Sequence, residues 1–347
     1  MPTSRYGRVL LVGLVLLTAV ALWQTRDGTP ALALVNAHPQ RVMGTDCTLV
    51  AAVAPGDIAR AQKALEAAEA VIRDVEARMS VYVEASELSR LNRAVAGENV
   101  PLTADTLGVL RIARDAASKT AGAFDATCPP VLLLWKDAGE RGKRPSEDAL
   151  SAAREATGWT RFELTSSGAQ KKMADARLDL GGIAKGHAID RTVGALKKAN
   201  VKAGLVEIGG DVRVFGPGPK GQGWAVHLRH PFRKGSCGTI ELQDAAVCTS
   251  GSYQRFTEIE GQRYSHIIDP RTARPVQDVP SVTVVAPDCI TADIWATALS
   301  VLGPEGLEKL AAIDGLEALL ITGRPEDFAI HQTPGFARLL RDPLRLE

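Results

Sequence analysis

The sequence predicts an α+β protein in which mixed or antiparallel sheets pack against helices. Early segments place apolar residues three and four apart, as on one face of a helix, whereas later segments alternate with a period of two, as in half-buried strands. Helical segments interrupt those strands without a regular strand–helix–strand repeat, which disfavours a doubly wound parallel sheet. Charge is nearly balanced, with 41 basic and 40 acidic residues, so the composition does not indicate a nucleic-acid binder.

The N-terminus indicates export. Arg5 and Arg8 precede an apolar run from Val9 to Leu22, which is the order of a secretory signal. The run is shorter than the roughly 20 residues that a membrane-spanning helix needs. We therefore expect residues 1–33 to form a signal peptide or a retained N-terminal membrane anchor, with a buried helix of the fold as the alternative. The folded domain would occupy residues 34–347, on the periplasmic side of a bacterial inner membrane.

Helical patterns dominate the first half of the expected domain. A strand is expected over Val42–Val53, and Asp57 then precedes a long amphipathic helix that runs to Met79. Three further helices are expected after residues whose side chains accept hydrogen bonds from free backbone N–H groups: Ser86, Thr103 and Ser146.

The second half is expected to be rich in strands. Two helices are expected among them, over Ile183–Asn200 and Thr291–Leu302, and Gly303 with Pro304 ends the second. The expected strands are Phe162–Thr165, Lys172–Leu180, Gly204–Ile208, Trp224–Arg229, Gly238–Leu242, Tyr264–Ile268, Val282–Val285 and Ala318–Ile321.

A glycine turn between an expected strand and helix is a candidate phosphate site. In the segment from Leu178 to Gly186, two glycines follow the strand end and a helix begins. Glycines allow close approach of a ligand, and a helix N-terminus offers free N–H groups to an anion. Lys185 would face a phosphate and Asp179 would accept hydrogen bonds from a sugar or base. A tight turn with a solvated lysine is the alternative.

Two residues near the start of the last expected helix are candidate metal ligands. Asp293 and Thr297 are four residues apart and share one helix face. A carboxylate and a hydroxyl are hard oxygen ligands of the kind that Mg²⁺ takes together with substrate phosphates. The alternative is that Asp293 only complements the helix dipole and Thr297 bonds back to a carbonyl.

His266 lies at the end of an expected strand, just before Asp269 and Pro270, and is a candidate general base. A structural histidine is the alternative. The five cysteines form no pattern typical of zinc. One pair could bridge in an oxidising compartment, with Cys237 and Cys248 favoured if they face each other across a hairpin, but we expect most cysteines to pack as small buried hydrophobes.

The three motifs just described occur once each along the chain, in a fixed order with several other segments. The segments are Met43–Thr45, Ser80–Tyr82, Ser86–Leu88, Asn92, Gly122–Thr127, Trp135, Asp179–Gly186, Gly209–Asp211, Thr249–Tyr253, His266–Pro270 and Ala292–Thr297. In this order the chain resembles the ApbE family, the FAD:protein FMN transferases, from about Met43 to Gly303. The resemblance implies a single ApbE-like, T-fold-related domain over residues 34–347.

The resemblance also implies roles for individual residues. Asp293 and Thr297 would bind Mg²⁺, with the backbone of Gly182 and of Ala296 completing the shell. Asp179 and Lys185 would contact FAD, and His266 would act in catalysis. The positions that match the lining of the flavin nucleotide pocket are Met43, Tyr82, Ala123, Phe124, Asp125 and Ile267.

The reaction implied is Mg²⁺-dependent transfer of FMN from FAD to a threonine hydroxyl of an acceptor flavoprotein, with release of AMP. The acceptor would be a subunit of a membrane redox complex, and no nucleic acid is expected as a partner. Two alternatives use the same residues: an Mg²⁺-dependent FAD pyrophosphatase that gives FMN and AMP, and a non-catalytic periplasmic flavin-binding factor.

Three positions depart from the family pattern. Ala273 stands where the family has a glycine, in a turn where the lost glycine would cost local strain. Cys128 and Pro129 replace a small apolar residue and a glycine, and Cys248 replaces an alanine. None of the three removes a proposed metal or FAD group.

Overall fold

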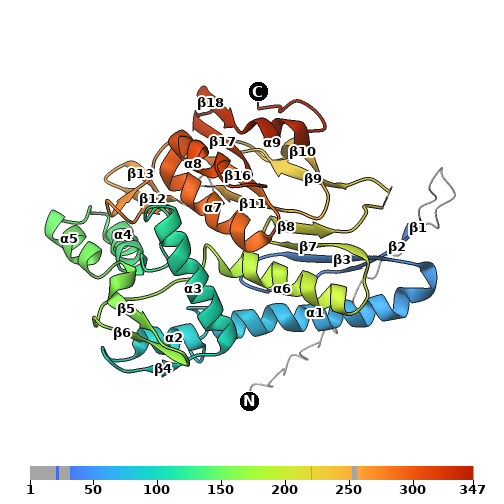
Figure 1. Cartoon of the computed structure of the whole chain (residues 1–347). Helices are drawn as coiled ribbons and strands as arrows, with labels where there is room; N and C mark the ends of the chain where they lie inside the picture. The colour runs from blue at the N-terminus through green and yellow to red at the C-terminus, as the bar shows by residue number, and fades with distance from the viewer. Residues whose placement is uncertain (1–20, 23–31, 220, 252–255, 347) are drawn as a thin grey trace, which may run out of the picture.

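A nine-stranded antiparallel sheet forms the centre of the molecule (Figure 1). The computed structural model describes residues 21–22, 32–219, 221–251 and 256–346. The strands of the sheet, in spatial order, are β1 (Ala21–Leu22), β2 (Ala33–Ala37), β3 (Cys47–Val53), β7 (Ala203–Ile208), β8 (Asp211–Phe215), β11 (Ala246–Gly251), β16 (Ser281–Ala286), β17 (Glu317–Arg324) and β18 (Asp327–Gln332). The predicted α+β class is confirmed.

Helices cover one face of this sheet, as Figure 1 shows for α1, α6 and α7. They are α1 (Ile58–Met79), α6 (Ala184–Lys198), α7 (Cys289–Leu302) and α8 (Gly306–Ala311). The apolar face predicted for the long first helix is buried as expected, for example at Leu65, Ile72 and Val75. These side chains pack with the sheet into the main hydrophobic core, so the helices are held by burial rather than by helix propensity alone.

The opposite face of the sheet has its own smaller core. The hairpin of β9 (Trp224–Arg229) and β10 (Ser236–Leu242) covers it together with α9 (Pro334–Leu339). Cys237 belongs to this second core, whereas Cys248 belongs to the main core. The two cysteines therefore do not meet across a hairpin, and the pairing weighed from the sequence is wrong.

A smaller lobe lies beside the end of the sheet (Figure 1). Its helices and short strands are α2 (Glu87–Arg93), α3 (Ala104–Lys119), α4 (Pro129–Arg141), α5 (Glu147–Glu155), β4 (Val100–Pro101), β5 (Phe162–Leu164), β6 (Gly168–Lys171), β12 (Phe256–Ile259), β13 (Gln262–Ser265), β14 (Ile268–Asp269) and β15 (Arg274–Pro275). Trp135 donates from Nε1 to the carbonyl of Ala273 at 2.8 Å. Ala273 adopts φ 58°, the left-handed conformation that explains why a glycine suits this position.

Three predicted helix starts are confirmed, the helix predicted from Thr291 begins at Cys289, and one predicted strand is wrong. Ser86, Thr103 and Ser146 each accept a hydrogen bond from the backbone N–H three residues later. Asp57 precedes α1, but its side chain makes no such bond. The segment 172–180 is not a strand, because a side chain of α2, rather than a neighbouring strand, bonds the backbone of residue 178.

Other predicted boundaries shift. The strand expected over residues 264–268 is divided between β13 and β14. Strands β2, β8 and β11 and helix α4 were not predicted. The export segment predicted over residues 1–33 falls almost entirely outside the described residues. Within the part of the chain that the structure describes, no helix is both long and apolar enough to span a bilayer.

Candidate active site

The glycine turn is anchored by a side chain from α2. The Asn92 amide accepts from the Leu178 N–H and donates to the Leu178 carbonyl, both at 2.8 Å. Asp179 follows, and its N–H donates to the Ala126 carbonyl at 2.9 Å. The Asp179 carboxylate accepts from the Gly181 N–H at 2.8 Å, which closes the turn. The backbone that leads into α6 is therefore held by hydrogen bonds to Asn92 before the turn and to the Asp179 carboxylate within it.

The first turns of α6 and α7 touch at Gly186. A Cβ at Gly186 would lie 2.5 Å from the Cys289 carbonyl oxygen and 2.7 Å from the Ile290 Cα, so only glycine allows this approach. The Gly186 N–H donates to Asp293 at 3.1 Å. Asp190 accepts from the N–H groups of Cys289 and Ile290, both at 2.9 Å, and so ties the start of α7 to α6. The glycine motif and the candidate metal motif are thereby brought together.

Lys185 lies between two buried carboxylates. Its Nζ donates to the Asp211 carboxylate and lies 3.8 Å from Asp293 Oδ1. The other oxygen of Asp211 accepts from the Thr249 N–H at 3.2 Å. Asp211 is the residue that the sequence did not assign: its turn segment was noted, but no role was given to its carboxylate. One ammonium and two carboxylates thus meet where β8, β11, α6 and α7 converge.

Burial and charge set the protonation of this cluster. Burial raises the pKa of Asp293 to about 6, partly offset by the neighbouring Lys185 ammonium. Burial opposes the charge on Lys185, but the carboxylates of Asp293 and Asp211 outweigh it and raise the pKa of that ammonium above its usual range. The Lys185 ammonium therefore stays charged at neutral pH, in contact with both carboxylates.

Thr297 lies beside the glycine turn, as the metal prediction requires. Its Oγ1 is 3.1 Å from the point that a Cβ on Gly182 would occupy. The hydroxyls of Thr192 and Ser300 donate to the carbonyl four residues earlier, as helical hydroxyls commonly do. Among the described residues, no such bond is found for Thr297. Its hydroxyl, one turn from Asp293, is thus left available to a ligand.

The donor set fits Mg²⁺ with substrate oxygens rather than an all-protein cage. Within the described ranges, no cluster of three or more His, Cys, Asp or Glu side chains could hold a metal ion. One carboxylate, one hydroxyl and a backbone carbonyl suit Mg²⁺ that also binds phosphate oxygens. Asp293, Thr297 and the backbone carbonyl of Gly182 are the predicted residues that would supply that set. The Ala296 carbonyl already accepts the Ser300 hydroxyl at 2.8 Å, so Ala296 fits least well.

The end of α3 forms a wall of the site. The Phe124 N–H donates to the Thr120 hydroxyl at 3.1 Å, and the Phe124 ring lies 3.3 Å from the Cβ position of Gly182. The Asp125 carboxylate accepts from the N–H and hydroxyl of Thr127, both at 2.8 Å. Burial raises the pKa of Asp125, and these bonds oppose that shift. Phe124 and Asp125 are therefore fixed beside the glycine turn, as predicted for a pocket lining.

The turn after β14 reaches the same wall. A Cβ on Gly122 would lie 3.4 Å from Arg271 Cγ, so the turn after β14 packs against the residue before buried Ala123. Ile267 is half-buried, and His266 is exposed. The structure thus brings the predicted catalytic histidine to the lobe that borders the pocket and leaves its side chain open to solvent.

Met43 and Tyr82 differ in how firmly they are held. Met43 adopts φ 49° in a tight turn closed by the Thr45 N–H and the Val42 carbonyl at 3.1 Å. That turn packs on the one before Asp211, since a Cβ on Gly209 would lie 2.9 Å from the Thr45 methyl. Tyr82 is 94% exposed. The turn that carries Met43 therefore borders the segment before Asp211, whereas Tyr82 would contact a ligand only from outside.

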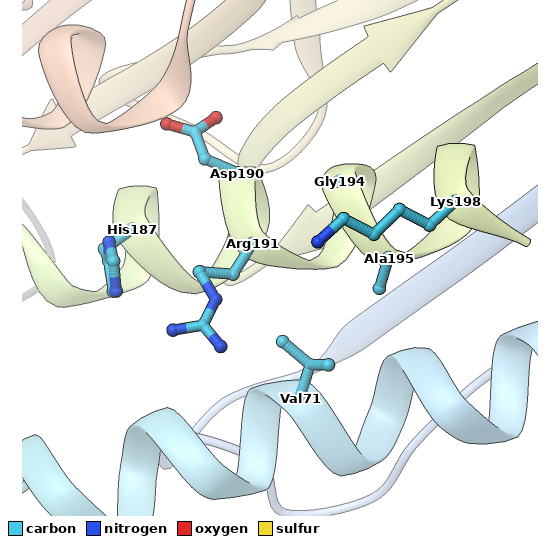
Figure 2. Close-up of a pocket in the computed structure, with 7 residues that line it drawn as sticks. All are labelled: Val71, His187, Asp190, Arg191, Gly194, Ala195 and Lys198. Carbon is cyan, nitrogen blue, oxygen red and sulfur yellow. The ribbon is translucent and has the colours of Figure 1, made fainter. Parts of the chain in front are cut away.

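A separate hollow lies between α1 and α6 (Figure 2). It has a volume of about 400 Å³ and is lined by Val71, His187, Asp190, Arg191, Gly194, Ala195 and Lys198. His187 and Arg191 bond to Asp105, and Figure 2 shows Asp190 directed away from α1. The hollow contains none of the predicted site residues, so the Lys185 cluster is the better candidate for chemistry.

Comparison with known proteins gives one consistent result. The family model described as the ApbE family matches residues 43–320. FAD:protein FMN transferases from Vibrio cholerae and Haemophilus influenzae are each 32% identical to this chain, over 86% and 81% of it and over 90% and 84% of their own lengths. The solved structure of the flavin transferase ApbE from Vibrio cholerae superposes with a TM-score of 0.78 at 30% identity, covering 89% of this chain and all of that one.

Proposed function

This chain belongs to the ApbE family, and we propose that it transfers FMN from FAD to a threonine hydroxyl of an acceptor protein, with Mg²⁺ at the site and AMP as the leaving group. It is an enzyme, because relatives that match it over most of their length are FAD:protein FMN transferases. FAD is therefore its substrate, and an acceptor flavoprotein is its partner.

The observation that carries the proposal is the convergence at Lys185. A fixed ammonium, the N-terminus of α6 and the Asp293–Thr297 pair meet beside a turn that a ligand can approach closely. A helix N-terminus and a lysine attract phosphate, and a carboxylate with a hydroxyl attracts a hard cation. A pyrophosphate with a bound cation needs both kinds of group. A simple structural turn needs neither.

Asp293, Thr297 and the Gly182 carbonyl would hold Mg²⁺. When bound, Mg²⁺ supplies positive charge that offsets the charge developing on the pyrophosphate and the AMP leaving group. Asp211 keeps Lys185 in place, and Gly186 keeps Asp293 next to it. The protein thus orients the pyrophosphate chiefly by placement and charge.

Other residues would serve the flavin side and the acceptor. Phe124 and Asp125 would line the flavin pocket beside the glycine turn, where Asp179 would accept hydrogen bonds from the ligand. His266 would take the proton from the acceptor hydroxyl, because an imidazole nitrogen can serve as a general base and this side chain is exposed.

The decisive experiment is a transfer assay. Purified protein, FAD and Mg²⁺ are mixed with a soluble acceptor domain, and the acceptor is weighed by mass spectrometry. We expect a gain equal to FMN minus water, lost when the target threonine is replaced by alanine. Release of free FMN and AMP without acceptor labelling would instead indicate a pyrophosphatase, and bound FAD without products would indicate a carrier.

We also propose that the chain acts on the periplasmic side of the inner membrane, on a subunit of a membrane redox complex. The basic and apolar order of its first residues supports this location. Cell fractionation with N-terminal sequencing tests it. Mature protein that begins near residue 34 indicates cleavage, an intact N-terminus in the membrane fraction indicates an anchor, and intact protein in the cytosol contradicts export.

A further inference from the structure

Two of the five cysteines are in direct contact beside the active site. Cys248 lies in β11 and Cys289 is the first residue of α7, and their Sγ atoms are 3.4 Å apart. Cys248 is 1% exposed and Cys289 is 0% exposed. No other two of the five cysteines have their sulfur atoms in contact, and all five lie in the described ranges.

The contact is close to what a covalent bond needs. A disulfide holds its sulfur atoms about 2.0 Å apart, so the two would have to approach by about 1.4 Å. Forming the bond therefore requires rotation of the two side chains or a shift of β11 against α7.

We propose that Cys248 and Cys289 form a disulfide that joins β11 to the first turn of α7 when the chain folds in the presence of a disulfide donor. With oxidised glutathione as donor, one cysteine thiolate attacks the donor disulfide and releases one glutathione thiol. The second cysteine then attacks the mixed disulfide, forms the Cys248–Cys289 bond and releases the other. Both protons end on glutathione, and the donor takes up the two electrons.

Burial fixes when this exchange can take place. Neither residue exposes its sulfur in the folded protein, so a donor reaches the pair only before β11 and α7 have closed on each other. The same burial protects the finished bond from reductants. The bond is therefore a product of folding conditions and not a rapid switch in the folded enzyme.

The position of the bond links it to the site. Thr249, next to Cys248, donates its N–H to Asp211, and Asp293 lies one turn after Cys289. A bridge therefore fastens α7, which carries Asp293, to β11, whose Thr249 holds the Asp211 carboxylate. It also closes a long loop, since the two cysteines are 41 positions apart. Closing such a loop restricts the unfolded chain and raises the melting temperature.

Refolding under defined redox conditions tests the proposal. The full chain is reduced and denatured, then refolded either with a mixture of oxidised and reduced glutathione or with excess reductant. In the glutathione sample we expect a mass lower by two hydrogens, a cross-linked Cys248–Cys289 peptide and three of the five thiols open to alkylation after denaturation. Its melting temperature should be higher by on the order of 3–8 °C.

Matched variants separate this bond from general oxidation. Cys248→Ala and Cys289→Ser should each abolish the mass change and the gain in melting temperature, whereas Cys237→Ala, which removes a buried cysteine from the second core, should keep both. Five alkylated thiols after oxidative refolding, a different cysteine pair, or an equal melting temperature in the two samples would overturn the proposal. Folded, reduced protein that forms the bond as fast as the refolding chain would also overturn it.

Discussion

Asp293 is the residue on which the proposed metal site depends most. It is the one carboxylate in the fitted donor set, and it is 4% exposed at the contact of α6 and α7. Replacing it with asparagine keeps the shape and removes the charge. We expect Asp293→Asn to lower the transfer rate by about 100-fold or more, since lost charge at a transition state costs several kcal/mol. Initial rates over a range of Mg²⁺ concentrations measure the effect.

A matched control lies on the same helix. Asp288→Asn makes the same change at the N-cap of α7, where the side chain accepts from the Thr291 N–H and asparagine caps equally well. Asp288→Asn should therefore transfer flavin at nearly the parental rate. If both variants keep full activity, Asp293 is not a metal ligand.

Met43 shows backbone strain at a residue expected to line the pocket. A left-handed conformation costs most L residues roughly 1–2 kcal/mol, and asparagine tolerates it better. We expect Met43→Asn to leave the free energy of unfolding within about 1 kcal/mol of the parent, because eased strain offsets lost packing. FAD affinity should nevertheless fall, by about tenfold, as an adaptable apolar contact is removed. Denaturant titration and FAD binding measure the two effects.

Arg41 provides the comparison for that substitution. It also has a left-handed conformation, with φ 54°, but its side chain is exposed. Arg41→Asn should ease strain without changing FAD affinity. Equal loss of FAD affinity in both variants would show that the turn, and not the Met43 side chain, is what the ligand requires.

At the scale of elements, Gly186 controls how closely α6 and α7 approach. A methyl group there meets backbone atoms of α7, which cannot move aside as a flexible side chain would. We expect Gly186→Ala to destabilise the protein by about 1–3 kcal/mol and to lower transfer, because Asp293 moves away from Lys185. Chemical denaturation and the transfer assay measure the two effects.

Gly194 offers the same substitution on the same helix without the contact. A Cβ at Gly194 meets nothing within 4 Å, and alanine is about 1 kcal/mol better than glycine inside a helix. Gly194→Ala should therefore stabilise the protein and leave transfer intact. Gly186→Ala protein as stable as Gly194→Ala protein would contradict the close approach described for α6 and α7.

Sequence patterns correctly predicted those elements whose formation depends on interactions between residues close in the chain. Capping hydroxyls such as Ser86 and the three-and-four spacing of α1 act within a few residues, and these predictions are confirmed. Strand β8 has only five residues, and its short polar–apolar alternation after the Gly209–Gly210 turn was not recognised as a strand. Residues 172–180 alternate like a strand but have no neighbouring strand to pair with.

The site residues that act through interactions local in the chain were also predictable, whereas the others were not. Lys185 and Asp293 stand out at helix starts, where free N–H groups and charge act locally. Asp211 does not stand out, because it meets Lys185 only through the order of strands in the sheet. Asn92 likewise reaches Leu178 across 86 positions of sequence. Such contacts depend on the whole topology and leave no pattern along the chain.

At the scale of the whole molecule, ligand binding should increase the stability of the folded state. A ligand that binds only the folded state at 100 times its dissociation constant stabilises it by about 2.7 kcal/mol. We expect FAD with Mg²⁺ to raise the melting temperature by several degrees, and FAD with a chelator to raise it less, because the pyrophosphate then lacks its cation. Thermal denaturation with the four combinations of FAD and Mg²⁺ measures this, and equal shifts with and without Mg²⁺ would show that the metal does not support FAD binding.

The proposed site residues lie on the face of the sheet that the helices cover, and not on the face with the second core. The Lys185 cluster, Phe124 and Thr297 lie with the main core or at its border, whereas the β9–β10 hairpin and α9 cover the other face. Substitutions in that second layer should therefore change stability more than transfer.

The order of the site along the chain has a consequence for synthesis. Met43 lies in the first segment of the domain, whereas Asp293 and Thr297 lie near its end, and β3 must await β7 before it has its second neighbour in the sheet. A nascent chain that has not yet released residue 297 from the ribosome therefore holds only fragments of the pocket. Incomplete products of translation should be unable to sequester FAD, and binding capacity should arise all at once when α7 docks.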